Sequence, residues 1–365
     1  MEENYGMEPE IAKTNEATDK KCDSCGGVMD FNPSTGTLKC PYCGFEKQIE
    51  VDEHSHGVEE LDFSKVEDTA CCDWGTKTRT VICKSCGAET VYDANDMANE
   101  CPYCGSNQVM EEGDKDTMAP GGVVPFAIDA KKAAELFKSW IGKKFFCPKL
   151  AKESAKPKSF KGLYIPYWTF DSNTTTNYRG EYGIDREVKD KEGNTKTVTD
   201  WYPTRGTHEE FFDDTLVCGS TKQDTGMLQG LEPFNTGAAV EYKAEYMAGF
   251  VAERYSLDVK SAWEKAKQKI KNILHGHIRE KIKDQKNADS VRNLNLNVDF
   301  RDVTYKYLLL PVWISAFQYK DKVYQFMVNG QTGKVTGKTP ISWIKVAITV
   351  VAVIAIIALI YYISN

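Results

Sequence analysis

Eight of the twelve cysteines of this chain form four Cys-x-x-Cys pairs, and these pairs make two sets with the same spacing. In each set, fourteen residues separate the two pairs, and the second pair reads Cys-Pro-Tyr-Cys-Gly. A Cys-x-x-Cys turn brings two thiolates to one ion, and two such turns complete a tetrahedral four-cysteine zinc site. The sequence therefore predicts two zinc ions, with the ligands Cys22, Cys25, Cys40 and Cys43 in one site and Cys83, Cys86, Cys101 and Cys104 in the other.

These zinc ions are expected to be structural. Cysteine fills all four positions of each site, so no coordination position remains open for catalysis. Disulfides are the competing interpretation of paired cysteines, but a reducing cytoplasm keeps thiols free. Four further cysteines have no partner at ligand spacing and are interpreted as ordinary thiols: Cys71, Cys72, Cys147 and Cys218.

Short hairpins must position the cysteine pairs. Met29–Phe31 and Thr37–Lys39 flank the turn sequence Asn32-Pro-Ser-Thr-Gly36, which is a hairpin signal. A unit of about thirty residues buries little apolar surface by itself, so the metal is expected to contribute much of its folding free energy. We expect one zinc ribbon over residues 20–50 and another over residues 79–111, with a polar linker over residues 51–78.

Charge is distributed unevenly along the chain, whose 365 residues carry a net charge of −7. Residues 1–115 contain 25 acidic and 10 basic residues, and the remainder is net positive. Residues 1–19 are expected to be a disordered acidic terminus. A negative segment repels phosphate groups, and zinc held by four thiolates adds negative charge, so nucleic acid is disfavoured as a partner of the ribbons. Protein docking is favoured instead.

Residues 343–363 predict a transmembrane helix. From Val346 to Ile363 the sequence has no charge, Gly or Pro, and eighteen residues at about 1.5 Å each span roughly 27 Å. A buried core helix is the alternative, but such a helix is usually shorter and polar on one face. Lys334, Lys338 and Lys345 precede the span, so the positive-inside rule predicts a cytoplasmic N-terminus. The chain start is acidic and lacks the apolar core of a signal peptide. We expect a single-pass tail anchor in the cell membrane, which contacts lipid.

The region between the ribbons and the anchor contains an internal repeat. After a Gly/Pro-containing linker over residues 112–122, Asp129 and Asp258 each open a helical pattern as a predicted N-cap. Leu163-Tyr-Ile-Pro166-Tyr-Trp168 resembles Leu308-Leu-Leu-Pro311-Val-Trp313. We therefore predict that residues 123–338 form one α+β domain of two similar halves, with antiparallel strands.

Helices and strands can be assigned within the two halves. The first half predicts a helix near Asp129–Phe145 and strands near Tyr164–Asp171, Thr176–Tyr182 and Thr195–Tyr202. The second predicts a helix from about Leu257 to Lys283, with eight apolar positions facing the sheet: Val259, Trp263, Ala266, Ile270, Ile273, Leu274, Ile278 and Ile282. Its opposite face is rich in Lys and is interpreted as a solvated face, with binding to anionic lipid as the alternative.

No known catalytic motif is present in the sequence. Gly337-Lys338-Thr339 lacks the glycine that a phosphate loop requires five residues earlier, and Pro340 follows in place of a helix start. His208-Glu209-Glu210 lacks the second histidine of a zinc-protease motif. We do not expect an enzyme or a small-molecule substrate, although an unrecognised site in residues 123–338 stays a third alternative.

Several of these features together resemble a group of bacterial zinc-ribbon membrane proteins. They are the Cys-Pro-Tyr-Cys-Gly ribbons, the Ile165-Pro166-Tyr167-Trp168 strand, the Phe145–Lys149 segment and the C-terminal anchor. Such proteins are often labelled TFIIB-type zinc-ribbon proteins or, by their ribbons, primosomal replication-restart helicase. The helicase label conflicts with the missing phosphate loop. The resemblance implies a membrane-bound adaptor, and some relatives are associated with envelope-stress systems containing phage-shock-type or flotillin-like partners.

The leading hypothesis is a membrane-anchored scaffold that displays acidic zinc ribbons in the cytoplasm and recruits cytoplasmic or membrane proteins. A membrane-associated nucleic-acid-binding protein is the alternative. Gel shifts at physiological salt distinguish the two, because phosphate contacts dominate nucleic-acid affinity.

Overall fold

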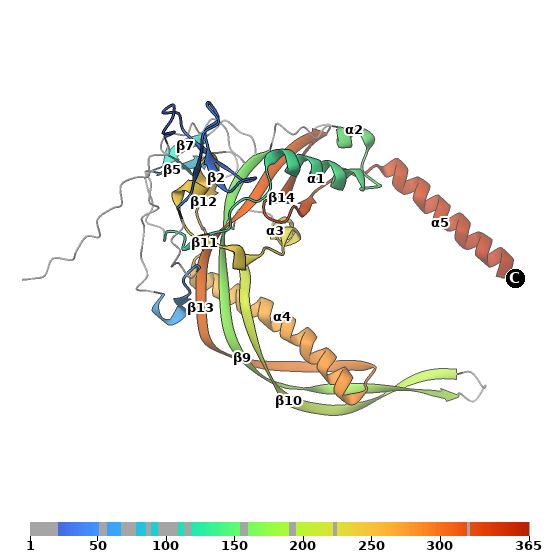
Figure 1. The fold of residues 1–365 in the computed structure, drawn as a ribbon. Coiled ribbons are helices and arrows are strands. Elements are labelled where there is room, and N and C mark those ends of the chain that lie inside the picture. The colour runs from blue at the N-terminus through green and yellow to red at the C-terminus, as the bar shows by residue number, and fades with distance from the viewer. Residues whose placement is uncertain are drawn as a thin grey trace, which may run out of the picture.

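A small antiparallel sheet, a larger and mainly antiparallel sheet and a long C-terminal helix define the architecture in Figure 1. This computed structural model describes residues 21–50, 57–66, 78–84, 89–93, 109–112, 118–153, 160–189, 195–221, 225–319 and 322–364. The N-terminal sheet has three strands, β1 (Asp30–Asn32), β2 (Thr37–Lys39) and β3 (Glu46–Gln48). The described helices are α1 (Ala130–Gly142), α2 (Lys149–Glu153), α3 (Thr225–Leu231), α4 (Val259–Lys286) and α5 (Trp343–Ser364). The predicted α+β class with antiparallel strands is confirmed.

The larger sheet joins segments from most of the chain. Its strands are β4 (Leu61–Asp62), β5 (Thr78–Cys83), β6 (Glu89–Asp93), β7 (Val109–Glu112), β8 (Gly122–Val123), β9 (Lys161–Lys189), β10 (Thr195–Cys218), β11 (Val240–Glu241), β12 (Val251–Glu253), β13 (Ser290–Tyr319), β14 (Lys322–Asn329) and β15 (Val335–Gly337). The strands β9, β10 and β13 are long and bend together, and α4 lies on the inner side of the bend (Figure 1).

The strand bounds differ from the sequence prediction in the first half. Tyr164–Asp171 and Thr176–Tyr182 are parts of one strand, β9, and β10 continues to Cys218. The polar run Ser172–Thr175 suggested a break between two strands. It stays extended because β10 and β13 pair with β9 on both sides there. Paired neighbours satisfy the backbone of a polar segment and override its weak strand signal.

The two predicted halves have matching strand pairings. β9 and β13 pair antiparallel, so that Ile165 lies opposite Leu310, its own counterpart in the repeat. β12 runs parallel to β9 with Val251 opposite Leu163, and β8 runs parallel to β13 with Gly122 opposite Leu308. Each half thus comprises a short strand, an Asp-capped helix, a long strand and a return strand.

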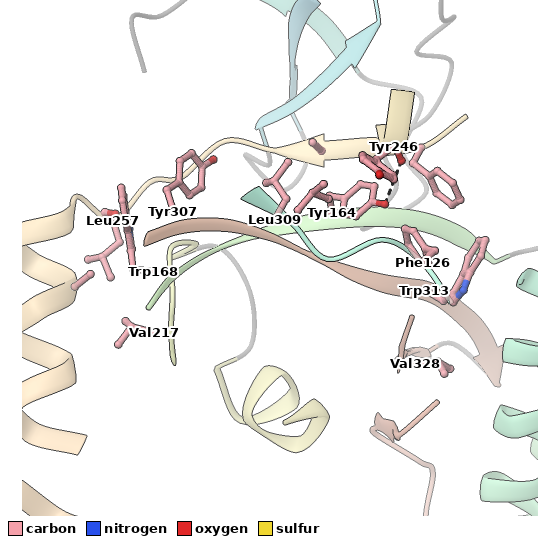
Figure 2. Close-up of a cluster of buried hydrophobic side chains, with 14 of the residues drawn as sticks. Phe126, Tyr164, Trp168, Val217, Tyr246, Leu257, Tyr307, Leu309, Trp313 and Val328 are labelled. Carbon is pink, nitrogen blue, oxygen red and sulfur yellow. Dashed lines mark hydrogen bonds between the residues drawn. The ribbon is translucent and has the colours of Figure 1, made fainter. Parts of the chain in front are cut away.

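Reciprocal hydrogen bonds connect the halves. Trp168 Nε1 donates to the carbonyl of Leu257 at 2.9 Å, and Trp313 Nε1 donates to the carbonyl of Ile128 at 2.7 Å. Each acceptor immediately precedes the capping Asp of the other half's helix. Figure 2 shows Trp168 beside Leu257 and, further along the two long strands, Trp313 beside Phe126. The repeated tryptophan of each half therefore binds the start of the helix in the other half.

The ends of β10 and β14 also contact the helix start of the opposite half. The N–H of Gly219, after β10, donates to the carbonyl of Pro166 at 2.8 Å, and the N–H of Gly330, after β14, donates to that of Pro311 at 2.8 Å. The Gly219 carbonyl accepts from the backbone N–H of Leu257, and the Gly330 carbonyl accepts from that of Ile128. A side chain at Gly330 would clash, because its Cβ would lie 2.5 Å from Phe126. The close backbone approach explains the glycine there.

Both helices begin at the predicted caps. Asp129 accepts from the N–H of Lys132 at 2.7 Å, and Asp258 accepts from that of Ser261 at 2.9 Å. The first helix ends at Gly142, earlier than predicted, whereas α4 continues to Lys286. Of the apolar positions assigned to the sheet-facing side of α4, Ile273 is wrong, because its side chain is 36% exposed. One turn of 3.6 residues cannot bury both Ile273 and Leu274 against the same narrow surface.

Part of the expected linker over residues 51–78 is built into the larger sheet. β4 pairs with β13, placing Leu61 opposite Tyr305. Phe63 follows directly and lies 5.7 Å from the ring of Trp263 and 6.2 Å from that of Phe170. The linker assignment is corrected for Leu61–Val66. This short apolar segment escaped notice because its partners are more than a hundred residues away.

Because the two tryptophan hydrogen bonds are equivalent, replacing either tryptophan should lower the stability of the protein by a similar amount. Trp168→Phe or Trp313→Phe leaves a backbone carbonyl without its indole donor, which costs about 1–3 kcal/mol of unfolding free energy. Trp201→Phe on β10 is the matched control, because its ring contacts the exposed Arg292 guanidinium at 4.0 Å. Urea unfolding of the full chain in detergent measures the effect. If the Trp313→Phe variant is as stable as Trp201→Phe, the hydrogen bond of Trp313 to Ile128 does not stabilise the fold.

Candidate metal centre

The first four predicted ligands converge at one point. The sulfurs of Cys22 and Cys43 lie 3.5 Å apart, as do those of Cys25 and Cys40, and all four Sγ atoms lie within 4.8 Å of one another. Zn–S bonds of about 2.3 Å in a tetrahedron place sulfurs roughly 3.8 Å apart. The donor set, its number and its spacing fit a structural zinc ion, and these residues would hold it.

Two similar turns present these sulfurs. The N–H of Gly26 donates to the carbonyl of Cys22 at 2.8 Å, and the N–H of Gly44 donates to that of Cys40 at 3.0 Å. Both glycines have positive φ, 73° and 76°, which a residue with a side chain adopts only with strain. The first cysteine of each pair is buried and the second is exposed. The site is therefore held by two preformed turns at the rim of the three-stranded sheet.

The thiols influence one another's protonation. The hydrogen bond from the backbone N–H of Cys43 lowers the pKa of Cys40 to about 7. A similar bond from Gly27 lowers the pKa of Cys25, but the neighbouring thiols Cys40 and Cys43 outweigh it and raise that pKa to about 12. Four clustered sulfurs cannot all ionise without a cation, because like charges repel at this distance. A divalent ion would remove this conflict.

The first ribbon packs against the α+β domain. The N–H of Phe31 on β1 donates to the carbonyl of Ala248 at 2.9 Å, and the Phe31 ring lies 5.6 Å from that of Tyr246 and 6.4 Å from that of Phe250. Met29 and Leu38 are buried with it. Sequence reasoning found the hairpin but missed this docking, because alternation identifies an apolar face without identifying what covers it.

The second predicted set lies mostly outside the described residues. Cys86, Cys101 and Cys104 are not described, nor are Cys71 and Cys72, whereas Cys83 ends β5. The described strands around this set repeat a feature of the first ribbon. Ile82 pairs with Glu89 across β5 and β6, just as Lys21 pairs with Val28 across the first turn. β6 also pairs with β12 and so joins this hairpin to the larger sheet.

Two other described cysteines are free thiols, of which Cys147 is buried and Cys218 is half-buried. Burial raises the pKa of Cys218 to about 12 and also raises the pKa of Cys147. A thiol with a raised pKa is protonated at neutral pH and reacts slowly, since the thiolate is the nucleophile.

A carboxylate cluster lies where the long strands bend. Asp171, Asp213 and Asp214 have oxygens close enough to share an ion. The Lys306 ammonium contacts Asp214 at 2.8 Å and Glu60 at 3.2 Å, so a cation of the chain itself offsets part of the negative charge. Both partners of β9 are irregular here, because register shifts fall between Phe212 and Thr215 on β10 and between Arg301 and Thr304 on β13. The ion pairs of Lys306 therefore join β13 to β10 and to the segment before β4 at this bend.

A second polar group was missed from the sequence. Glu210 on β10 accepts from His208 at 2.9 Å and contacts His277 of α4 at 3.0 Å. Burial raises the pKa of Glu210, but the two imidazoles outweigh it and lower the pKa overall. The second histidine comes from a distant helix, so no local motif could show it. These three groups fasten α4 to β10.

The buried Asp171 predicts a pH-dependent stability. Burial raises its pKa to about 6 from the ordinary value of 3.8. The folded state therefore retains this proton longer than the unfolded state, and stability falls as pH rises from about 4 to about 6. Asp171→Asn keeps the oxygen that accepts from the N–H of Asp214 and removes the charge. We expect its stability advantage over the unmodified chain to grow by about 2–3 kcal/mol across this range.

Thermal unfolding in detergent between pH 4 and 8 checks this expectation. Asp299→Asn, at an exposed position on β13, is the matched control. If the stability of Asp171→Asn relative to the unmodified chain does not change with pH, as expected for the control, burial does not raise the pKa of Asp171.

Comparison with known proteins yields one full-length relative. The chain is 30% identical over 334 residues to a Bacillus subtilis (strain 168) protein described as "Uncharacterized protein YdjG", and the match covers 90% of this chain and 91% of the relative. No protein-family model and no solved structure matches the chain. The resemblance to TFIIB-type zinc-ribbon proteins therefore stays a prediction. Identity at this level over nearly the whole of both chains shows that this protein belongs to the same family as YdjG of Bacillus subtilis.

Proposed function

We propose that this protein is a membrane-anchored cytoplasmic scaffold that recruits protein partners through its zinc ribbons. The observation that carries the proposal is α5. Its segment Trp343–Ile363 is long and apolar enough to span a bilayer, and none of its most apolar window is buried against the rest of the protein. A row of exposed Ile and Val side chains would be costly in water, whereas hydrocarbon accommodates it.

The same helix supports an orientation. Lys334, Lys338 and Lys345 lie on the side of the span that leads to the α+β domain. Lysines concentrate on the cytoplasmic side of membrane proteins. The proposal therefore places residues 1–342 in the cytoplasm, where reduced cysteines favour metal binding over disulfides.

Zinc is proposed as the ion of both cysteine sets. Four thiolates in a tetrahedral arrangement suit zinc, and such a site fixes structure without open coordination. For the second set, support comes from the identical spacing and from the matching strand pairs Lys21–Val28 and Ile82–Glu89.

The metal-bearing end of the first ribbon offers a surface for a protein partner. Phe31 covers the side that faces the domain, whereas Tyr42 is 79% exposed, and Phe45 and Val28 are also exposed. We call these three residues the Tyr42 surface. The Tyr42 ring lies directly over Gly27, where an added Cβ would approach it to 2.6 Å. Rigid exposed aromatic side chains on a metal-fixed turn suit protein binding, since they bury much area at little entropic cost.

Metal content tests the two-zinc proposal. Elemental analysis of fresh, reduced, full-length protein should give about two zinc ions per chain, because each set supplies four ligands. Cys40→Ser and Cys101→Ser should each lose one ion and retain the other. Cys147→Ser, which replaces a buried thiol outside both sets, should retain two. A count near one or zero in the unmodified chain contradicts the proposal.

Recruitment is tested with the full chain in its native membrane. Tyr42→Ala combined with Phe45→Ala should abolish proximity labelling of a defined set of neighbouring proteins, while zinc content and membrane location stay unchanged. The matched control is Tyr202→Ala with Phe211→Ala, because these β10 side chains are also exposed and apolar. If both double variants retain the same labelled proteins, recruitment by the Tyr42 surface is wrong. Labelling dominated by nucleic-acid-bound proteins and sensitive to nuclease also contradicts it.

A further inference from the structure

An exposed apolar surface surrounds the base of α5. It consists of Phe145, Phe146, Leu150 and Ile341, and we call it the Phe145 patch. Phe145, Leu150 and Ile341 are 66%, 68% and 58% exposed. Phe145 and Phe146 belong to the connection between α1 and α2, and Leu150 lies in α2, nearly two hundred residues before the span. Figure 1 shows α2 at the end of the domain from which α5 leaves.

Hydrogen bonds fix the Phe145 patch to the first turn of α5. The N–H of Ser342 donates to the carbonyl of Phe146 at 2.8 Å. The Lys345 ammonium donates to the carbonyls of Phe145 at 2.9 Å and Cys147 at 3.0 Å, and it lies 5.6 Å from the centre of the Phe145 ring. Two further contacts fix the loop to the domain. The side chain of Cys147 is buried, and Lys152 donates to the carbonyl of Gly142 at 2.7 Å. The patch therefore cannot lie far from the point where α5 begins.

The charge around the patch matches a lipid surface. Residues 138–152 contain five lysines and no acidic residue, and Lys143, Lys144 and Lys149 are exposed. Lysines beside exposed aromatic and aliphatic side chains are typical of segments that lie in the headgroup layer of anionic membranes. Trp343 begins α5, and tryptophan also favours this layer.

We infer that the Phe145 patch is a second membrane contact, which inserts its apolar side chains into the headgroup layer of an anionic bilayer beside α5. This inference rests on the proposed anchoring by α5 and deepens it. A single helix lets a domain tilt and rotate at the surface. A second contact held to its first turn fixes the domain's orientation and presents the Tyr42 surface at a constant angle.

Photocrosslinking from the full chain in vesicles tests the inference. The probe is benzoylphenylalanine, placed at Phe145, Leu150, Val353 or Phe211 in separate variants, in vesicles of phosphatidylcholine with phosphatidylglycerol. Val353 lies in the middle of α5 and reports the anchor itself, whereas Phe211 is a similarly exposed side chain on β10. Lipid adducts are expected at Phe145, Leu150 and Val353, and not at Phe211.

The outcomes separate the two proposals. Lipid adducts at Val353 alone overturn the second contact and leave the anchor intact. No lipid adduct at Val353 in reconstituted protein overturns the anchor and, with it, the inference. Adducts between two copies of the chain at Phe145 identify a protein interface in place of a lipid contact.

The lysines provide an independent test. Lys143→Gln, Lys144→Gln and Lys149→Gln together should lower the adduct yield at Leu150 several-fold in anionic vesicles and leave the yield at Val353 unchanged. Because salt and neutral lipid remove the electrostatic attraction, the same triple variant should behave like the unmodified chain in pure phosphatidylcholine. An equal yield at Leu150 in anionic vesicles with and without the lysines contradicts the lipid assignment.

Discussion

The antiparallel pairing of β9 with β13 is the interaction on which the rest of the structure depends. On β9 this pairing runs from Lys161 to Gly183, and every other strand of the larger sheet attaches to β9 or β13 directly or through intervening strands. The pairing places Trp168 and Trp313 where each reaches the helix start of the opposite half. Because neither half completes its own contacts, the two halves must assemble together, which favours cooperative folding over two independent steps.

Local signals were sufficient to predict some parts of the protein. The capping residues Asp129 and Asp258 identified both helix starts, because a cap acts within four residues. The Cys22–Cys43 site was predicted in full for a similar reason, since two turns and one hairpin bring its ligands together. The fold class followed from the repeat. Contacts between distant segments could not be predicted from the sequence: the docking of Phe31 on Tyr246, the ion pair of Lys306 with Glu60 and the pairing of Leu61 with Tyr305 each join residues more than a hundred positions apart.

The carboxylates at the bend and the sulfurs of the first ribbon differ in the cation that stabilises them. At the bend, Lys306 contacts Asp214 and Glu60 from within the fold and offsets part of their negative charge. In the first ribbon the four sulfurs lie within 4.8 Å of one another, and these residues would hold a metal ion supplied from outside the chain. The folding of the ribbon then becomes linked to metal supply, since thiolates must be ionised to bind and the ion stabilises the folded form.

The pairing of β6 with β12 has a consequence for how the protein can be divided. β12 lies between β9 and the β5–β6 hairpin, and the ring of Phe250 beside it packs against Phe31 of the first ribbon. A chain cut after residue 112 would expose an unpaired strand edge next to uncovered aromatic side chains. Exposed edges of this kind recruit other strands and lead to aggregation. The N-terminal region therefore also protects this sheet edge, and its proteolytic removal would expose a surface that promotes aggregation.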